Sequence, residues 1–482
     1  MRWTATSSAR RCSSHGSTVR SSTFYVRRST FWIATVVLLA VPACGPAGGK
    51  AGNAAARIDA LIEDLHQRGL FDGAVVVGDD RSILYDKGFG DANIERGIAF
   101  TPDTPADGAS LAKTFTATLL LSLQSDGRLK LDDPVQRYVP ELPYADITLR
   151  HLLSHSSGLP VADYDYFDPF LPKGDVRTTD RLVAVLHDQR PPLSFPPGTA
   201  FEYSSFGYDV AALAAGRAAA STYSALLRER FFDRLDIASA FVRPGRFADF
   251  PGVRTLGYRR VNDKRELNDV FEGEGFHGGS NIYISARDLH RWNTSFLTAP
   301  VLEPAALASA LEFARIGLAA SGLTQGNWYR EADGSTFWYS GHLQGFHSEV
   351  FRDVRARRSI VYVSNNTMRS WLQKALVRAI DAILEGADAP AMDAPAVDDV
   401  APEDLALVTG TWKAEREPAT IARTGDHLSL LHNGIAYRMV QVERAMFYVP
   451  GLDYMVGFAK NPSGAFTKLY LASNVSETYI NR

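Results

Sequence analysis

Cysteine is almost absent from this chain of 482 residues, and its two cysteines, Cys12 and Cys44, both precede residue 50. The rest of the sequence therefore has no disulfide framework, no cysteine-based metal site and no cysteine nucleophile. It also contains no H-E-x-x-H zinc motif, no P-loop and no G-x-G-x-x-G before a helix, so we expect no metal site and no cofactor. The absence of G-x-S-x-G argues against an α/β-hydrolase.

A strong net charge is also missing. The 51 Lys and Arg residues nearly balance 54 Asp and Glu residues, which leaves a formal charge of −3 and gives no electrostatic argument for a nucleic-acid partner. The hydrophobic content of 45% is that of an ordinary globular protein with a sizeable core. At about 100–200 residues per domain, the length predicts about two to four structural units.

The N-terminal segment contains no acidic residue before Asp59, and several arginines precede an apolar run over residues 31–43. This run is shorter than the ~20 residues needed to span a bilayer, but it suits the apolar region of a signal peptide. Residues 41–44 resemble a bacterial lipobox that ends in Cys44. We therefore expect a signal and lipobox segment over 1–44, lipidation of Cys44 and a tether over 45–55. Ordinary cleavage or an uncleaved anchor helix are the alternatives.

The most apolar internal segment, residues 115–123, follows Ser110 and Lys113. We predict a buried helix here, with Ser110 in its first turn and Gly127 as its C-terminal stop. Residues three apart lie on the same helical face, so the pair forms the S-x-x-K device of serine acylating enzymes. In a chain with 51 Lys and Arg residues, such a pattern can also arise by chance.

The patterns in the remaining chain predict a mixture of helices and strands. The expected elements are a helix over 56–69, strands over 74–78 and 82–85, mainly helical structure over 133–269, a helix over 286–297, strands over 348–351 and 358–365, a helix over 371–385, and short strands between 404 and 482.

Several spaced motifs carry a family resemblance across about 330 residues. They lie, in family order, at 88–90, 110–115, 131–134, 147–159, 195–198, 203–205, 278–279 and 345–346. With these motifs, residues 56–387 resemble the serine β-lactamase and penicillin-binding-protein-like family, which includes class C β-lactamases, D,D-carboxypeptidases, D-aminopeptidases and family VIII esterases. The resemblance implies an α+β fold: an antiparallel sheet flanked by helices, an inserted all-helical subdomain at about 131–270, and a site in the groove between them.

The C-terminal part is expected to fold separately. Residues 388–402 are rich in Ala, Pro and Asp and are interpreted as a linker. Residues 403–482 are predicted to form a small all-β domain, and its start at 409–412 resembles the lipocalin-like domain that follows some members of this family. It could cover the catalytic unit or bind a partner.

The resemblance assigns roles to three residues: Ser110 as nucleophile, Lys113 as the lysine that accepts or relays its proton, and Tyr203 as the tyrosine that shares this task and protonates the leaving group. Burial and a neighbouring charge bring the protonation equilibria of an amine and a phenol closer together, so one proton can pass between them near neutral pH. Without the resemblance, Tyr203 would be interpreted as a packed aromatic residue.

Two positions depart from the family pattern. Ser205 stands where the second motif usually has Asn, so contact with a substrate amide should weaken. The third motif falls on Tyr339, Ser340 and Gly341, and Tyr339 replaces a cation that would hold a substrate carboxylate. An aromatic residue here is similar to family VIII esterases. We predict that Ser205, Tyr339 and Gly341 contact substrate.

The same alignment predicts an oxyanion hole formed by the backbone N–H groups of Ser110 and His342. In a second alignment, His342 itself would begin the third motif. His151, His155 and Ser157 are interpreted as structural. The aromatic stretch Tyr164, Tyr166, Phe167 and Phe170 could either pack as a loop or line an apolar acyl pocket.

We therefore predict a serine hydrolase that acts through an acyl-enzyme on an ester or amide, with an esterase-like preference. The alternatives are a D,D-carboxypeptidase, D-aminopeptidase or β-lactamase of the same mechanism, or a non-catalytic ligand-binding protein of the cell envelope. The expected partners are a small-molecule ester or peptide substrate and a membrane surface, reached through the lipid anchor. We expect the protein to be exported to the periplasm or cell envelope.

Overall fold

The computed structural model describes residues 48–482 apart from 161–163, 262–263, 299–300, 317–318, 332, 395–408, 413–418, 425–426, 433, 444–445, 451, 453, 461–465, 473–476 and 482. The predicted signal segment, with Cys44, lies outside the described residues, as does most of the predicted linker. Across the described parts of the chain, no helix has both the length and the apolar character needed to span a bilayer.

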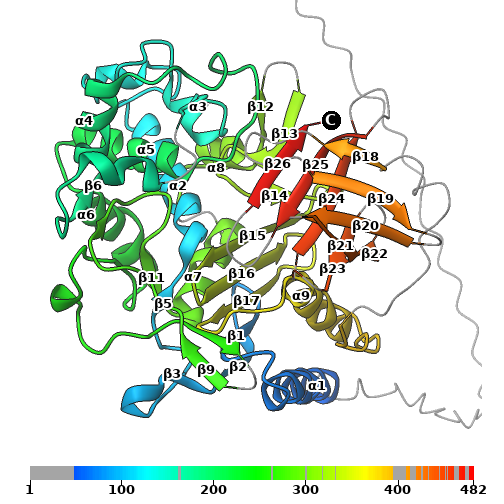
Figure 1. Cartoon of the computed structure of the whole chain (residues 1–482). Coiled ribbons are helices and arrows are strands. Elements are labelled where there is room, and N and C mark those ends of the chain that lie inside the picture. Colours follow the sequence, from blue (N-terminus) through cyan, green and yellow to red (C-terminus); the bar gives the residue numbers. More distant parts are fainter. Residues whose placement is uncertain are drawn as a thin grey trace, which may run out of the picture. The chain divides into compact units, whose positions relative to one another are not determined.

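An antiparallel sheet of eight strands forms the centre of the region predicted to be catalytic (Figure 1). Its strand order is β12-β13-β14-β15-β16-β17-β1-β2, so the N-terminal hairpin β1–β2 joins the end of a sheet built from residues more than 220 positions later. The strands are β1 Gly73–Gly78, β2 Ile83–Phe89, β12 Phe313–Ile316, β13 Ala319–Thr324, β14 Tyr329–Arg330, β15 Thr336–Leu343, β16 Phe346–Asp353 and β17 Arg358–Ser364.

Helices cover both faces of this sheet. On one face, α1 (Gly48–Gln67) and α9 (Ser370–Leu384) pack against Val75 and Val77 of β1. On the other face, α2 (Ala112–Ser125) and α7 (Ala286–Thr298) share a core with Val76. Successive strand residues point to opposite faces, so an almost wholly apolar β1 is what a sheet covered on both sides requires. The predicted antiparallel sheet flanked by helices is confirmed.

The region between the hairpin and the later strands is mainly helical, as expected. Its helices are α3 Leu149–Leu153, η4 Tyr164–Phe170, α4 Thr179–Gln189, α5 Ser205–Ala219, α6 Tyr223–Leu227 and η5 Arg228–Phe232, and α8 (Pro304–Leu311) follows later.

This region also contains short strands that the sequence did not predict. They are β6 Arg177–Thr178 with β10 Glu274–Gly275, β7 Phe241–Val242 with β11 Ile282–Ile284 and β5 Ala106–Asp107, and the hairpin β8 Tyr258–Val261 with β9 Lys264–Leu267. The hairpin is rich in charged residues and mostly exposed, so it lacks the apolar alternation by which a half-buried strand is recognised.

The C-terminal region is all-β, as predicted. It forms a four-stranded sheet (β18 Gly410–Trp412, β19 Ala419–Thr424, β20 His427–His432, β21 Ile435–Arg438) and a five-stranded sheet (β22 Val440–Glu443, β23 Met446–Val449, β24 Tyr454–Lys460, β25 Phe466–Ala472, β26 Glu477–Asn481). Trp412, Phe447 and Val456 belong to a core of its own. The lipocalin-like resemblance stays a prediction.

The helices and strands that were predicted individually before residue 388 lie within a few residues of their predicted positions, whereas the sheet strands β12, β13 and β14 were not predicted. The N-terminal helix differs most, because α1 already begins at Gly48, inside the stretch expected to be a tether. Strand β2 is also longer than the predicted strand over 82–85, since it extends to Phe89.

Candidate active site

Ser110 lies in a short 3-10 turn, η2 (Ala109–Leu111), that leads directly into α2. Nearly every residue of α2 is buried, and Gly127, at φ 71°, follows its end, so the predicted buried helix and its glycine stop are confirmed. The helix proper begins two residues after Ser110, and the nucleophile candidate therefore occupies the turn before the helix.

A buried carboxylate holds this turn. Ala109 has a φ of 50°, a left-handed conformation that costs energy for a residue with a side chain, and its backbone N–H donates to Asp107 Oδ1 at 2.8 Å. Asp107 and Arg243 are both fully buried and lie 3.4 Å apart. Burial raises the pKa of Asp107 to about 6 even though Arg243 pulls it down. The ion pair thus fixes the strained residue next to Ser110.

Two side chains meet at the Ser110 hydroxyl. Tyr203 Oη lies 2.9 Å from Ser110 Oγ, and Lys113 Nζ lies 3.1 Å from the same atom. The amine also lies 4.8 Å from the centre of the Tyr203 ring. Both the phenol and the amine are therefore within hydrogen-bond reach of the Ser110 hydroxyl.

The amine of Lys113 has no contact with solvent, because the side chain is fully buried. It donates to three oxygens: Ser110 Oγ at 3.1 Å, Ser205 Oγ at 3.1 Å and the backbone carbonyl of Gly279 at 2.6 Å. Ser205, predicted to contact substrate, is therefore a partner of the lysine. The sequence did not predict the Gly279 contact, although 278–279 was among the matched motifs.

Tyr203 is positioned by the start of α5 and by a buried histidine. Ser204 caps the helix by accepting the N–H of Gly207 at 3.0 Å. The ring of His155 stacks on the Tyr203 ring at 4.5 Å, and its Nδ1 accepts the N–H of Ser204 at 3.1 Å. Burial lowers the pKa of His155 to about 3, so the ring is neutral and can accept this hydrogen bond. His155 thus has the structural role that was expected.

Strand β15 lies against the nucleophile turn. Tyr339 is 2% exposed, and its pKa is raised by burial and by the neighbouring Tyr203 side chain. A Cβ on Gly341 would overlap the carbonyl oxygen of Gly108, so only glycine allows this approach. The backbone of His342 follows directly, whereas its ring packs 4.3 Å from that of His347. Tyr339, and not the His342 ring, therefore lies beside Tyr203.

The aromatic stretch forms the 3-10 helix η4 rather than a loop, and its side chains mainly pack against their neighbours. Tyr164 stacks on Phe276 at 4.2 Å, and its hydroxyl donates to Asp209. Phe167 is buried against Phe206, and Phe170 is 43% exposed. Asp209 was not singled out from the sequence, although an acidic residue within an otherwise apolar helix was an available signal.

The buried carboxylate of Glu349, on strand β16 next to β15, predicts that the stability of the protein depends on pH. Glu349 is 2% exposed and accepts the Ser340 hydroxyl at 2.7 Å, and burial raises its pKa to about 7 despite this hydrogen bond and the attraction of Lys374. Between about pH 4.5 and 7 the folded protein keeps a proton that the unfolded chain releases, so the free energy of unfolding should fall as pH rises, by roughly 2–3 kcal/mol.

Glu349→Gln should remove most of this fall, measured by urea unfolding at pH 5 and pH 7.5. Exposed Glu266 offers a matched control, and Glu266→Gln should leave the difference as in the wild type. An unchanged difference in Glu349→Gln would show that Glu349 is not its source.

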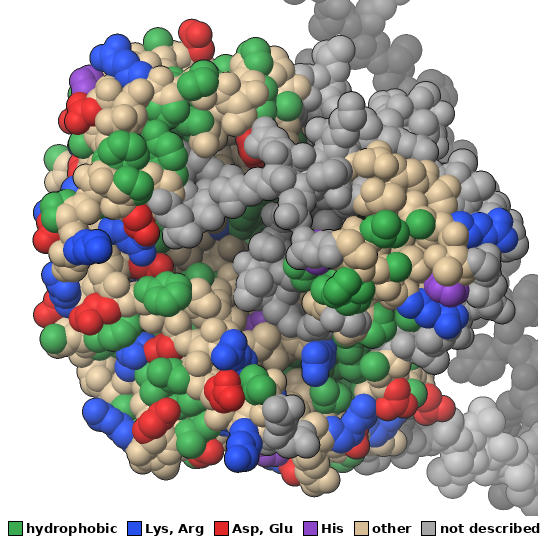
Figure 2. Space-filling model, viewed as in Figure 1, with side chains coloured by type: hydrophobic (Ala, Val, Ile, Leu, Met, Phe, Trp, Pro, Cys, Tyr) green, Lys and Arg blue, Asp and Glu red, His purple; other side chains and the backbone are tan. Residues whose placement is uncertain are grey.

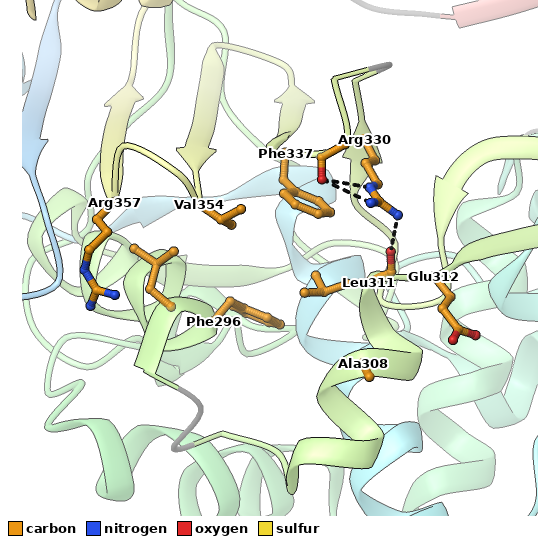
Figure 3. Close-up of a pocket in the computed structure, with 10 residues that line it drawn as sticks. Phe296, Ala308, Leu311, Glu312, Arg330, Phe337, Val354 and Arg357 are labelled. Carbon is orange, nitrogen blue, oxygen red and sulfur yellow. Dashed lines mark hydrogen bonds between the residues drawn. The ribbon is translucent and has the colours of Figure 1, made fainter.

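A pocket of about 410 Å³ lies apart from these residues, between α7, α8 and strands β14 and β15 (Figure 3). Phe296, Leu311, Phe337 and Val354 point into it, and Arg330 donates to the carbonyl oxygens of Gly334 and Leu311. The Arg330 guanidinium is therefore already hydrogen-bonded to backbone carbonyl groups. Within the described residues, no group of three or more His, Cys, Asp or Glu side chains is arranged to hold a metal ion.

The sequence profile of the Beta-lactamase family matches residues 58–384, more than half of the chain. The chain belongs to the Beta-lactamase family. Its members are serine hydrolases. Penicillin-binding protein 4* of Bacillus subtilis is 25% identical over 350 residues, which are 69% of this chain and 77% of that protein. Protein flp of Staphylococcus aureus is 25% identical over 64% of this chain and 62% of its own length.

Solved structures share the fold. SurE superposes with a TM-score of 0.63 at 22% identity, covering 90% of this chain and all of that one. A D-amino acid amidase from Ochrobactrum anthropi SV3 gives 0.52 at 23% identity, over 70% of this chain and 97% of that one. EstCE1, described as a hydrolase with promiscuous acyltransferase activity, gives 0.52 at 19% identity, over 66% and 94%. At these identities the likeness concerns the fold alone.

Proposed function

We propose that this member of the Beta-lactamase family hydrolyses uncharged carboxylic esters through an acyl-enzyme on Ser110. The observation that carries the proposal is the meeting of Tyr203 Oη and Lys113 Nζ at the Ser110 hydroxyl, at 2.9 and 3.1 Å. A serine becomes a nucleophile when a positioned base takes its proton, and these are the only two titratable side chains that the described residues place within hydrogen-bond distance of Ser110 Oγ.

The chemistry divides into acylation and deacylation. As Ser110 Oγ attacks the ester carbonyl carbon, its proton passes to the Lys113–Tyr203 pair. The oxyanion is stabilised by the backbone N–H groups of Ser110 and His342, and the leaving alkoxide takes the proton from the pair. Water then attacks the acyl-enzyme with the same pair as base, which releases the acid and restores the Ser110 hydroxyl.

The preference for uncharged esters rests on two side chains. Tyr339 brings a phenol to the place where a cation would hold a substrate carboxylate. Ser205 accepts from Lys113 and offers one hydroxyl where Asn would offer an amide with two donors and an acceptor, so contact with a substrate amide is weaker. On the face drawn in Figure 2, positive and negative side chains are interspersed over the described surface.

Labelling and a substrate panel test the proposal. A fluorophosphonate probe should modify the peptide that carries Ser110, and kcat/KM should be at least about 100-fold higher for p-nitrophenyl butyrate than for a D-Ala-D-Ala peptide, a D-alanine anilide or nitrocefin. Preferred turnover of the peptide, the anilide or nitrocefin would instead indicate a D,D-carboxypeptidase, a D-aminopeptidase or a β-lactamase. Absence of both labelling and turnover would favour a non-catalytic ligand-binding protein.

We also propose that the protein is exported and held at a membrane surface by a lipid on Cys44. The support is the sequence pattern of residues 31–44, which lies outside the described structure. Cys44→Ala should move the protein from the membrane fraction to the soluble fraction of the envelope, while Cys12→Ala should not. Equal membrane association of both variants would contradict a lipid on Cys44.

A further inference from the structure

Asp209 is a fully buried carboxylate in the first half of α5, and its hydrogen-bond partners are neutral. Its Oδ1 accepts the backbone N–H of Gly279 at 2.8 Å, and its Oδ2 accepts the hydroxyl of Tyr164. No salt bridge joins it to a cation within the described residues. Burying a carboxylate without a paired cation costs free energy. The role of the two hydrogen bonds that Asp209 makes therefore needs an explanation.

The backbone that Asp209 holds is packed tightly between two helices. A Cβ on Gly278 would overlap the carbonyl oxygen of Tyr208 in α5, and one on Gly279 would lie 2.6 Å from the carbonyl oxygen of Ser205. From the other side, the Thr116 hydroxyl of α2 donates to the carbonyl of Gly278 at 2.7 Å. The glycines permit this close packing, but they also leave the backbone intrinsically free to rotate.

The carbonyl of Gly279 makes the shortest of the three contacts to the Lys113 amine, at 2.6 Å. Its direction depends on rotation about the backbone bonds of Gly279. Because Asp209 fixes the N–H on one side of this residue, the carbonyl on the other side is directed toward the amine. Tyr164 in turn orients the carboxylate, and Phe276 stacks on Tyr164 at 4.2 Å.

We propose that Asp209 is a positioning residue for Lys113, acting through the Gly279 backbone and supported by Tyr164. The inference rests on the proposed role of Lys113 in the hydrolysis. It also gives Tyr164, the first residue of the aromatic stretch, a function. Tyr164 holds the Asp209 carboxylate, which in turn directs the Gly279 carbonyl toward Lys113. The rival explanation is that Asp209 only stabilises the fold, as buried hydrogen-bonded carboxylates often do.

The test compares Asp209→Ala and Asp209→Asn with a matched control. Asp288 is also buried on a helix, and its partners are the backbone N–H of Ser239 at 2.8 Å and the guanidinium of Arg291, not the backbone of Gly279. With p-nitrophenyl butyrate, Asp209→Ala should lower kcat about 10- to 100-fold and leave KM within about twofold, because a misplaced catalytic group affects turnover more than binding. Asp209→Asn keeps an acceptor for Gly279 and should recover most of this loss.

Asp288→Ala should lower the melting temperature about as much as Asp209→Ala but leave kcat within about threefold. An equal loss of kcat in Asp209→Ala and Asp209→Asn would overturn the proposal, since it would show that the charge acts and not the bond to Gly279. An unchanged kcat in Asp209→Ala would overturn it as well.

A second measurement does not depend on activity. The ammonium of Lys113, assigned by its loss in Lys113→Met, should give a ¹H–¹⁵N correlation that Asp209→Ala shifts or broadens and Asp209→Asn preserves. If the wild type neither turns over esters nor reacts with fluorophosphonate, the proposed function fails, and this signal still decides the positioning role. The same signal in Asp209→Ala and wild type would exclude that role.

Discussion

Ser110→Ala is expected to lower kcat/KM for p-nitrophenyl butyrate by at least about 10³-fold, because the variant cannot form an acyl-enzyme. The substitution removes one oxygen from a turn that is otherwise held by Asp107 and by strand β11, where the N–H of Gly108 donates to Ile282. The fold should therefore survive, with an unchanged circular dichroism spectrum. Steady-state hydrolysis measures the loss of activity. Intact-mass analysis after fluorophosphonate treatment measures the loss of covalent labelling.

Ser280→Ala provides the control, because Ser280 is also partly buried and follows Gly279 but hydrogen-bonds to Asn281 and not to Ser110. It should remain within about threefold of the wild type. Ester turnover that survives Ser110→Ala would remove Ser110 from the mechanism, whatever the geometry around it.

Lys113→Met should lower kcat by about 10²–10⁴-fold, the usual contribution of a positioned general base. Methionine fills a similar volume, and replacing a buried charge with an apolar side chain is often neutral for stability. The variant does leave the Gly279 carbonyl without its amine donor, so a small fall in melting temperature is expected. Stopped-flow measurement of the acylation step shows whether the loss lies in the attack by Ser110.

Lys87→Met controls for the removal of a lysine, since Lys87 is partly exposed and pairs with Asp59 on the surface. Its activity should match that of the wild type. If Lys113→Met acylates at the wild-type rate, Tyr203 is the base by itself and the lysine serves another purpose.

The sequence was sufficient for the parts of the fold that depend on local pattern. Residues 286–297 and 371–385 show helical periodicity and form α7 and α9, and the apolar run 74–78 forms β1. The surface hairpin β8–β9 was missed because charged residues on both of its faces hide the alternation of a strand.

The sequence predicted those parts of the site that consist of side chains in recognisable motifs. Ser110, Lys113 and Tyr203 were named from spaced patterns, and they meet. The Gly279 carbonyl could not be named, because a backbone oxygen leaves no residue type in the sequence by which to recognise it. Asp209 could have been noticed as an acidic residue in an apolar helix, but its partner could not, because the bond to Gly279 joins positions 70 residues apart that no local pattern relates.

The contact between the nucleophile turn and the sheet joins distant parts of the chain. The hydroxyl of Ser348 donates to the carbonyl of Gly108 across 240 positions. When only the first 300 residues have left the ribosome, the nascent chain contains Ser110, Lys113 and Tyr203. It still lacks strands β15 and β16, which complete their surroundings. Such long-range closure slows folding, so esterase activity should arise late in biosynthesis, after nearly three quarters of the polypeptide has been made.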